Sequence, residues 1–175
     1  PLSDEDDLNR LMVTEDAEDA SAIMTDVADL GHVIELYAAY GEGIRTSLCR
    51  IGGRTCGLVV SDHQVDNGRL TVENSKKAAR FVRLCDCFSL PVVSLVNADG
   101  IAVPCQCKQG DMLRAAAEPC YAYAECTAPK VGIICGNAVG AAYVAMGGKD
   151  MADVSYAWPA AMIAPLTEEV AVQTL

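Results

Sequence analysis

The stretch VGIICGNAVGAAYVAMGG, residues Val131–Gly148, decides the fold of this 175-residue chain. It begins with VGIIC, a fully apolar run between Lys130 and Gly136 that is typical of a buried strand. The run Ala138–Met146 then has a helical composition and mostly small side chains. The pattern predicts that a buried strand turns sharply through Gly136–Asn137 into an alanine-rich helix.

Such a turn also has a chemical interpretation. The first N–H groups of a helix have no acceptor in a preceding turn, so they point at whatever lies beyond the helix start. Because glycine and alanine let a substrate approach the backbone closely, the segment suits an oxyanion hole, which binds an oxygen that becomes negative during a reaction. The same small residues also suit a tight strand–helix connection with no chemical role. The residues alone leave both interpretations open.

Composition and charge exclude several classes of protein. About half of the residues are apolar (51%) but only 5% are aromatic, so the core must consist of Ala, Val, Leu and Ile. The net charge of −11 disfavours nucleic acids and anionic membranes as partners. No apolar run approaches the ~20 residues that span a bilayer, and the acidic start PLSDEDDLNR lacks a signal-peptide pattern. We therefore expect a cytoplasmic protein without a direct membrane span.

The nine cysteines are an odd number, and several lie in apolar runs. We therefore expect reduced thiols that behave as small hydrophobic side chains. Cys85–Cys87 and Cys105–Cys107 are C-x-C pairs, which differ from the C-x-x-C spacing of zinc and redox centres. In a helix, Cys85 and Cys87 would point to different faces. The sequence predicts no metal site.

Acidic residues are concentrated near the N-terminus, in Asp4–Asp7, in Glu15–Asp19 and up to Glu35. We predict that residues 1–45 form an acidic, solvated arm with helical content, such as a helix over Ala28–Tyr40. Residues 46–175 then form the folded domain.

From residue 46 onward, short apolar strands alternate with longer helical patterns. Gly52–Gly53 separates two strand patterns and indicates a hairpin, and Pro119 marks a break or kink inside one helical pattern. These β–β–α and β–α units predict a layered α/β fold with a parallel sheet. The expected strands are 47–51, 55–61, 92–96, 130–135, 153–156 and 161–163, and the expected helices are 71–88, 111–126, 139–146 and 167–175.

Four blocks of the sequence resemble one known family in their order and spacing. They read GGRTCGLV (52–59), KKAARFVRLCDCFSLPVVSLVNADG (76–100), APKVGIICGNAVGAAYVAM (128–146) and YAWPAAMIA (156–164). The chain is similar to acyl-CoA carboxyltransferase subunits, which belong to biotin-dependent propionyl-CoA and acetyl-CoA carboxylases and to methylmalonyl-CoA and glutaconyl-CoA decarboxylases. The resemblance covers nearly the whole chain and corresponds to the C-terminal half of a much longer subunit. It implies a crotonase-like ββα superhelix.

The resemblance also implies an activity, which is carboxyl transfer between biotin on a separate biotin carboxyl carrier protein and a short-chain acyl-CoA. The backbone amides of Ala141 and Ala142, beside Gly140, are then the oxyanion hole for the ureido oxygen of biotin. Val144 is implied to face the acyl group and to help select it. A second oxyanion hole and most of the CoA surface are expected in an N-terminal carboxyltransferase half. We therefore expect a homo- or hetero-oligomer.

Two segments depart from the family pattern. The family usually has Gly-Gly-Ala-Tyr where this chain has Gly140, Ala141, Ala142 and Tyr143, and alanine donates the same N–H as glycine. We expect Tyr143 to contribute to substrate binding. The family loop Asp-Val-Pro-Gly-Phe-x-Pro-Gly reads NADGIAVP here, residues 97–104, and keeps only Gly100. Gly100 is expected to bind the cofactor.

Two other functions stay open at this point. A stand-alone crotonase-type hydratase or isomerase predicts a pair of acidic side chains near the hole, and Gly136–Met146 contains none. A non-catalytic assembly subunit is compatible with the altered loop at 97–104.

Other charged residues are weaker candidates. Lys76, Lys77 and Arg80 either meet CoA phosphates or form a solvated helix face. His63, in SDHQ, is the side chain most like a general base, although a lone loop histidine is usually solvated. His32 is less suited still.

Overall fold

The computed structural model describes residues 11, 18–102 and 109–174. Its strands are β1 (Val33–Leu36), β2 (Ile44–Ile51), β3 (Arg54–Ser61), β4 (Val92–Ala98), β5 (Lys130–Val139), β6 (Val154–Ala157) and β7 (Met162–Ala164). Its α-helices are α1 (Ala20–Val27), α2 (Val72–Cys87), α3 (Gln109–Glu125), α4 (Gly140–Ala145) and α5 (Glu168–Thr174). Two short 3₁₀ turns, η1 (Asp29–Gly31) and η2 (Asp66–Gly68), lie between them.

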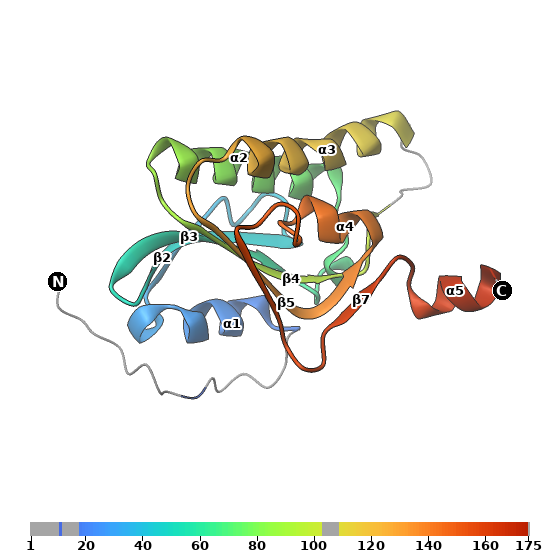
Figure 1. Cartoon of the computed structure of the whole chain (residues 1–175), viewed down its shortest axis with the longest axis horizontal. Helices are drawn as coiled ribbons and strands as arrows, with labels where there is room; N and C mark the ends of the chain where they lie inside the picture. The colour runs from blue at the N-terminus through green and yellow to red at the C-terminus, as the bar shows by residue number, and fades with distance from the viewer. Residues whose placement is uncertain (1–10, 12–17, 103–108, 175) are drawn as a thin grey trace.

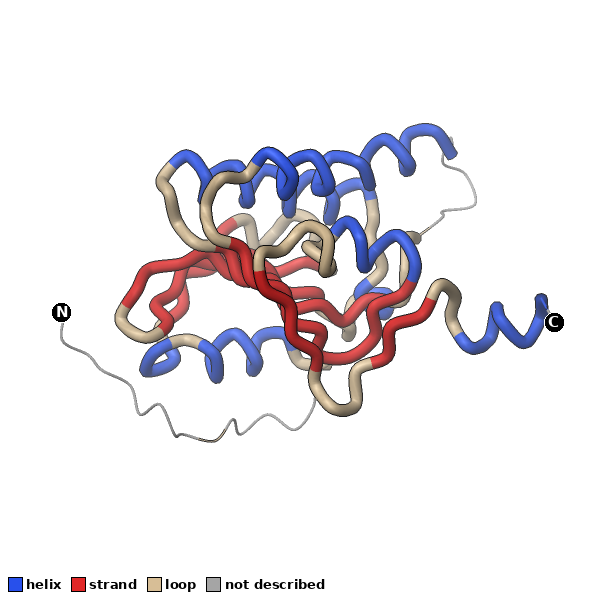
Figure 2. Tube along the Cα trace, viewed as in Figure 1, coloured by secondary structure: helices blue, strands red, loops and turns tan. Residues whose placement is uncertain are grey.

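The strands form one seven-stranded sheet in the order β1-β2-β3-β4-β5-β6, with β7 pairing the far end of β5. β1, β2 and β3 pair antiparallel, whereas the pairs from β3 onward are parallel. Helices α2 and α3 cover one face of the sheet and α1 covers the other, as Figures 1 and 2 show. The predicted layered α/β fold with parallel strands is therefore confirmed.

Each face of the sheet has its own hydrophobic core. Val59 packs with Phe81 and Tyr123, which come from α2 and α3, and its neighbours Leu58 and Val60 pack with Ile23 of α1 on the opposite side. This division follows from strand geometry, because successive side chains of a strand point to opposite faces. Since β3 is covered on both faces, its whole apolar run is buried.

The hairpin predicted at Gly52–Gly53 joins β2 to β3. Both glycines have left-handed φ values, 58° and 75°, which a two-residue turn of the type that matches strand twist requires. The carboxylate of Asp29 accepts hydrogen bonds from both backbone N–H groups, at 2.9 Å and 2.7 Å. Asp29 therefore ties the η1 turn to the hairpin.

The prediction of a helix over Ala28–Tyr40 is wrong. The helix lies earlier, in α1, where Asp19 caps the first turn by accepting the N–H of Ala22 at 3.0 Å. Leu30 and the glycine after it have left-handed φ values of 54° and 68°, which break a helix, and β1 then pairs with β2. Whether residues 1–45 form an arm of the whole protein stays a prediction.

Helix α2 lies where the sequence predicts a helix, and Thr71 caps its first turn, since the hydroxyl of Thr71 accepts the N–H of Asn74 at 3.1 Å. The prediction that Lys77 meets either solvent or a phosphate is wrong. Its side chain is buried, with 1% exposed, and its ammonium donates to the carbonyl of Gly41 at 3.3 Å. Burial lowers the pKa of Lys77. The next lysine, Lys76, is exposed.

Most of the described thiols are buried, as predicted for small hydrophobic side chains. All seven described cysteines are free, and five of them are buried. Cys85 is buried while Cys87 is exposed, so the two point to different faces of α2, as expected. The pair Cys105–Cys107 lies outside the described residues. Among the described helices, none is both long and apolar enough to cross a membrane.

Candidate active site

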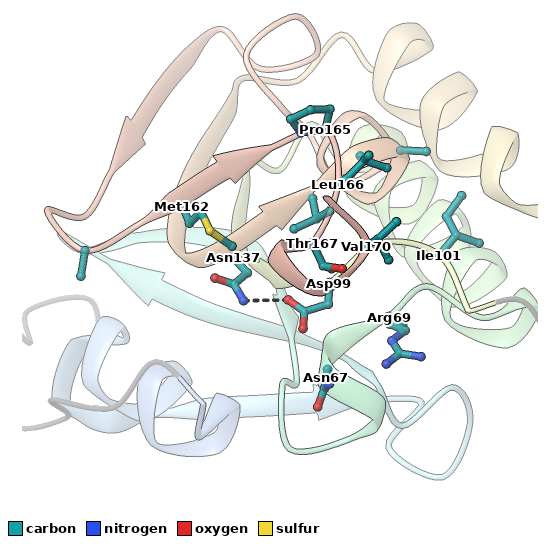
Figure 3. Close-up of a pocket in the computed structure, with 15 residues that line it drawn as sticks. Asn67, Arg69, Asp99, Ile101, Asn137, Met162, Pro165, Leu166, Thr167 and Val170 are labelled. Atoms are coloured by element: carbon teal, nitrogen blue, oxygen red, sulfur yellow. Dashed lines mark hydrogen bonds between the residues drawn. The ribbon is translucent and has the colours of Figure 1, made fainter. Parts of the chain in front are cut away.

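A pocket of about 920 Å³ opens at the carboxyl ends of the parallel strands, where ligands bind in open α/β sheets (Figure 3). The loop after β4 and the turn after β5 form two of its walls, and residues around η2 and after β7 form the others. The polar side chains that line it are Asn67, Arg69, Asp99, Asn137 and Thr167.

The turn from β5 into α4 occurs later than the sequence predicts. The strand continues through Gly136–Asn137 to Val139, because β7 pairs with residues 137–139 and extends the ladder. The chain then turns at Gly140, whose φ is +55°. A β-carbon there would lie 3.1 Å from the carbonyl oxygen of Pro165, so both the backbone conformation and the space favour glycine.

Three of the predicted site residues meet in the pocket. Gly100, Gly140 and Ala141 line it, although 40 residues separate the first two along the chain. Ala141 is exposed, whereas Ala142 is fully buried directly behind it. The N–H groups of Ala141 and Ala142 belong to the first turn of α4, where an amide has no acceptor within the helix.

The other three predicted residues, Ala142, Tyr143 and Val144, are not among the residues that line this pocket. Val144 is 45% exposed on the outer surface of α4. The hydroxyl of Tyr143 accepts the backbone N–H of Lys149 at 3.0 Å, which closes the turn after the helix. Their roles in substrate binding stay predictions.

Sequence reasoning missed the polar residues that shape the pocket. The side-chain amide of Asn137 donates to Oδ1 of Asp99 at 2.7 Å (Figure 3). The backbone N–H of Asn137 donates to Oδ1 of Asn97 at 2.8 Å. These bonds join the end of β4 to β5. A signal was present, because polar residues interrupt two otherwise apolar strands near their carboxyl ends.

The two histidines considered as general bases lie elsewhere, and the thiol of β5 is not ionised. Neither His63 nor His32 lines the pocket. Burial raises the pKa of the Cys135 thiol, the cysteine of β5, to about 12, so that thiol is protonated at neutral pH. Among the described residues, no group of three or more His, Cys, Asp or Glu side chains is placed to hold a metal ion. The groups that this pocket presents are therefore backbone amides and a few polar side chains.

Comparison with known proteins identifies the family. Residues 3–175 match the model of the carboxyl transferase domain. The chain is 36% identical over 158 residues to the methylmalonyl-CoA carboxyltransferase 12S subunit of Propionibacterium freudenreichii subsp. shermanii, covering 90% of this chain and 30% of that protein. It is 43% identical over 132 residues to the biotin-dependent acetyl-/propionyl-coenzyme A carboxylase beta5 subunit of Mycobacterium tuberculosis (strain CDC 1551 / Oshkosh), covering 75% of this chain and 24% of that protein.

A solved structure agrees with these relatives. The transcarboxylase 12S crystal structure, a hexamer with methylmalonyl-coenzyme A and methylmalonic acid bound, superposes with a TM-score of 0.87 at 35% identity. The match covers 94% of this chain and 33% of that one, so the chain spans about a third of the length of the proteins that it matches. The predicted crotonase-like fold is thereby confirmed, and the chain belongs to the carboxyl transferase domain family.

Proposed function

We propose that this chain is the C-terminal half of a carboxyltransferase that moves a carboxyl group between biotin and a short-chain acyl-CoA. The observation that supports the proposal is the turn at Gly140, which begins α4 beside a pocket lined by Gly100, Gly140 and Ala141. Relatives that include a biotin-dependent acetyl-/propionyl-CoA carboxylase subunit support it.

The residues present fit the ureido ring of biotin. The wall of the pocket at Gly140 and Ala141 has no large side chain, so a planar ring can approach the backbone closely. We assign the ureido oxygen to the amides of Ala141 and Ala142. Biotin, when bound, supplies the nitrogen that carries the carboxyl group and that takes the proton from the acyl α-carbon.

The chain's own contribution is then to stabilise charge and to align the reactants. The N–H dipoles of Ala141 and Ala142 are fixed, so they would stabilise negative charge on a ureido oxygen held there without reorganising. One such donor accelerates a reaction by about 10²–10³-fold, and alignment contributes up to about 7–11 kcal/mol more. Neither effect needs an acidic or basic side chain from this chain.

The two alternative functions have less support. A hydratase or isomerase needs a pair of acidic side chains at the hole, and among the described residues that line the pocket only Asp99 is acidic. A purely structural subunit does not need the glycine turn at Gly140 or a pocket beside it.

We infer that two partners complete the enzyme. A biotin carboxyl carrier protein presents the biotin, and an N-terminal carboxyltransferase half supplies the thioester oxyanion hole and most of the CoA surface. The second inference rests on the relatives, about a third of whose length matches this chain. The hexamer of the related transcarboxylase supports an oligomer. We place the enzyme in the cytoplasm.

The test is reconstitution of carboxyl transfer. The chain is combined with a carboxylated biotin carrier and with the N-terminal part of a related subunit, and labelled carboxyl groups are followed onto acetyl-, propionyl- and butyryl-CoA. We expect transfer only when both halves are present. Absence of transfer to all three thioesters, from halves that are folded and associated, contradicts the proposal.

The same assay tests the acyl-selecting role that we propose for Val144. One methylene in an acyl pocket changes selectivity by about 10–200-fold. Val144→Ile is therefore expected to shift the ratio of propionyl to butyryl transfer. An unchanged ratio removes Val144 from the acyl site, while leaving the assignment of Ala141 and Ala142 intact.

A further inference from the structure

A strained turn, η2, builds one wall of the pocket. In η2, three successive residues, Asp66, Asn67 and Gly68, have left-handed φ values of 49°, 53° and 66°. For the first two this conformation is costly, and such strain persists only where the surrounding structure imposes it. Gly68 is buried against β4, and a β-carbon on it would collide with the carbonyl oxygen of Asn97. The turn is thereby fixed relative to the pocket.

This turn delivers Arg69 to the pocket. The backbone of Arg69 is held on both sides, since its N–H donates to Asp66 at 3.0 Å and its carbonyl accepts Nδ2 of Asn74 at 3.1 Å. Its guanidinium is 3.9 Å from the Asp66 carboxylate, and both side chains are about half exposed, 42% and 52%. Such an exposed, distant pair binds weakly, so the guanidinium can exchange this partner for a ligand.

A negative charge lies on the neighbouring wall. Oδ1 of Asp99 accepts the side-chain amide of Asn137, and the backbone N–H of Asp99 donates to the carbonyl of Asn67 at 3.1 Å. Within the described part of the chain, Asn137 is the only side chain that hydrogen-bonds this carboxylate. Its second oxygen therefore keeps its capacity to accept a donor from the pocket.

The two opposite charges indicate a ligand with two kinds of group. Arg69 is the only basic side chain among the described residues that line the pocket, in a protein of net charge −11. It suits a carboxylate, which a planar guanidinium binds through two parallel hydrogen bonds. Asp99 suits an N–H donor. A cyclic urea that carries a carboxylate on one ring nitrogen and a hydrogen on the other has both groups, one on each side of its carbonyl oxygen.

We propose that Arg69 and Asp99 recognise the carboxylated form of the ureido ring, with Arg69 binding the carboxylate and Asp99 accepting the N–H of the other ring nitrogen. This inference rests on the function proposed above, which assigns the carbonyl oxygen between these groups to Ala141 and Ala142. Under this proposal the pocket distinguishes the carboxylated ring from the ring without a carboxylate, because Arg69 has no carboxylate to bind in the second form.

The test uses stable fragments and NMR titration of the chain labelled with nitrogen-15. The first fragment is 2-oxoimidazolidine-1-acetate, a stand-in for the labile N-carboxylate. Its methyl ester has no charge, and its 3-methyl derivative has no N–H. We expect weak binding of the acetate, with a Kd of about 1 mM for a fragment of this size. The amide signals of Gly100 and Ala141 should move.

Two variants separate the two contacts. Arg69→Gln should lower the affinity for the acetate about 10-fold or more and leave the affinity for the ester unchanged, because only the acetate carries the negative charge. Asp99→Asn should lower the affinities for the acetate and the ester by a similar factor. It should not lower the affinity for the 3-methyl derivative, which has no N–H to donate. Since Oδ1 stays bonded to Asn137, the asparagine would turn its own N–H₂ toward the ring N–H. Arg80→Gln, which removes an exposed cation that stacks on Tyr37 outside the pocket, is the matched control.

Each result has one meaning. Suppose that the acetate and the ester bind with equal affinity, that both move the amide signal of Ala141, and that neither variant changes their affinities. The ureido site is then supported, and the roles proposed for Arg69 and Asp99 are wrong. Methylmalonate has a carboxylate but no N–H. If it binds as tightly as the acetate, and binds more tightly to Asp99→Asn than to the parent chain, the site recognises an acyl carboxylate and the proposal is overturned. If no fragment moves the pocket amides, the proposed function itself fails, together with this inference.

Discussion

The side-chain oxygen of Asn97, near the end of β4, accepts the backbone N–H of Asn137, near the carboxyl end of β5, at 2.8 Å. The ladder between these strands shifts register at this point, between Val96 and Ala98. Asn97 thus supplies the hydrogen bond that the irregular ladder leaves unmade. The loop with Gly100 and the turn at Gly140 lie just beyond it, so one side chain sets the spacing between two pocket walls.

Replacing Asn97 by alanine should therefore destabilise the protein. The change leaves a backbone N–H without its acceptor in a buried setting, which costs about 1–3 kcal/mol. Urea unfolding followed by circular dichroism measures the loss, and Gln64→Ala, at an exposed position whose φ is not left-handed, is the control. A loss for Asn97→Ala no greater than for the control would show that the bond does not hold the strands.

Gly140→Ala should destabilise the protein more than Gly52→Ala. The two glycines have similar left-handed φ values, 55° and 58°, so alanine has the same backbone cost at both, about 1–2 kcal/mol. A β-carbon at Gly52 meets nothing within 4 Å, whereas one at Gly140 lies 3.1 Å from the carbonyl oxygen of Pro165. The difference in unfolding free energy isolates that contact. Equal losses would mean that the chain after β7 moves away freely.

Asp86 should make the stability depend on pH in the acidic range. Its Oδ1 accepts the N–H and hydroxyl of Thr127 and the N–H of Ala128, at 2.8, 2.9 and 3.2 Å. These bonds, first of all the one from the Thr127 backbone, hold the pKa of Asp86 below its ordinary value of 3.8. The stabilisation is therefore complete above pH 3.8 and is lost as the pH falls through the lower, folded-state value.

The measurement compares Asp86→Asn with the parent chain in urea, at neutral pH and well below pH 3.8. The variant should be less stable at neutral pH, and the gap should close in acid. Glu125→Gln, which removes an exposed carboxyl on α3, controls for the loss of one surface charge. A gap that is independent of pH would show that the ionised carboxylate is not what binds Thr127.

The sequence predicts most of the fold because its apolar periodicity is strong. The alternation around Gly52–Gly53, the helical pattern that begins at Thr71 and the apolar run of β5 each match an element of the structure. The helix prediction over Ala28–Tyr40 failed because two left-handed residues and pairing with β2 override a helical composition. Such tertiary pairing is not visible in a local pattern.

Some residues of the candidate site could be predicted from the sequence and others could not. Gly100, Gly140 and Ala141 could be found, since small residues after buried strands are a local signal. Arg69 and Asp99 could not, because they face one pocket only through the η2 turn and the irregular end of β4. Long-range placement of this kind depends on register and on strained φ values, neither of which has a periodic signature.

The most direct test of the account is a comparison of Ala141→Pro with Ala141→Ser in the reconstituted carboxyl-transfer assay. Ala141 is exposed to the pocket and lies in the first turn of α4, where proline is tolerated, so proline removes one N–H with little change in packing. Serine keeps the N–H at nearly the same size. We predict that proline lowers the transfer rate by about 10²–10³-fold and that serine retains it within a few-fold. A folded Ala141→Pro protein that transfers carboxyl groups at the parent rate would contradict the oxyanion hole.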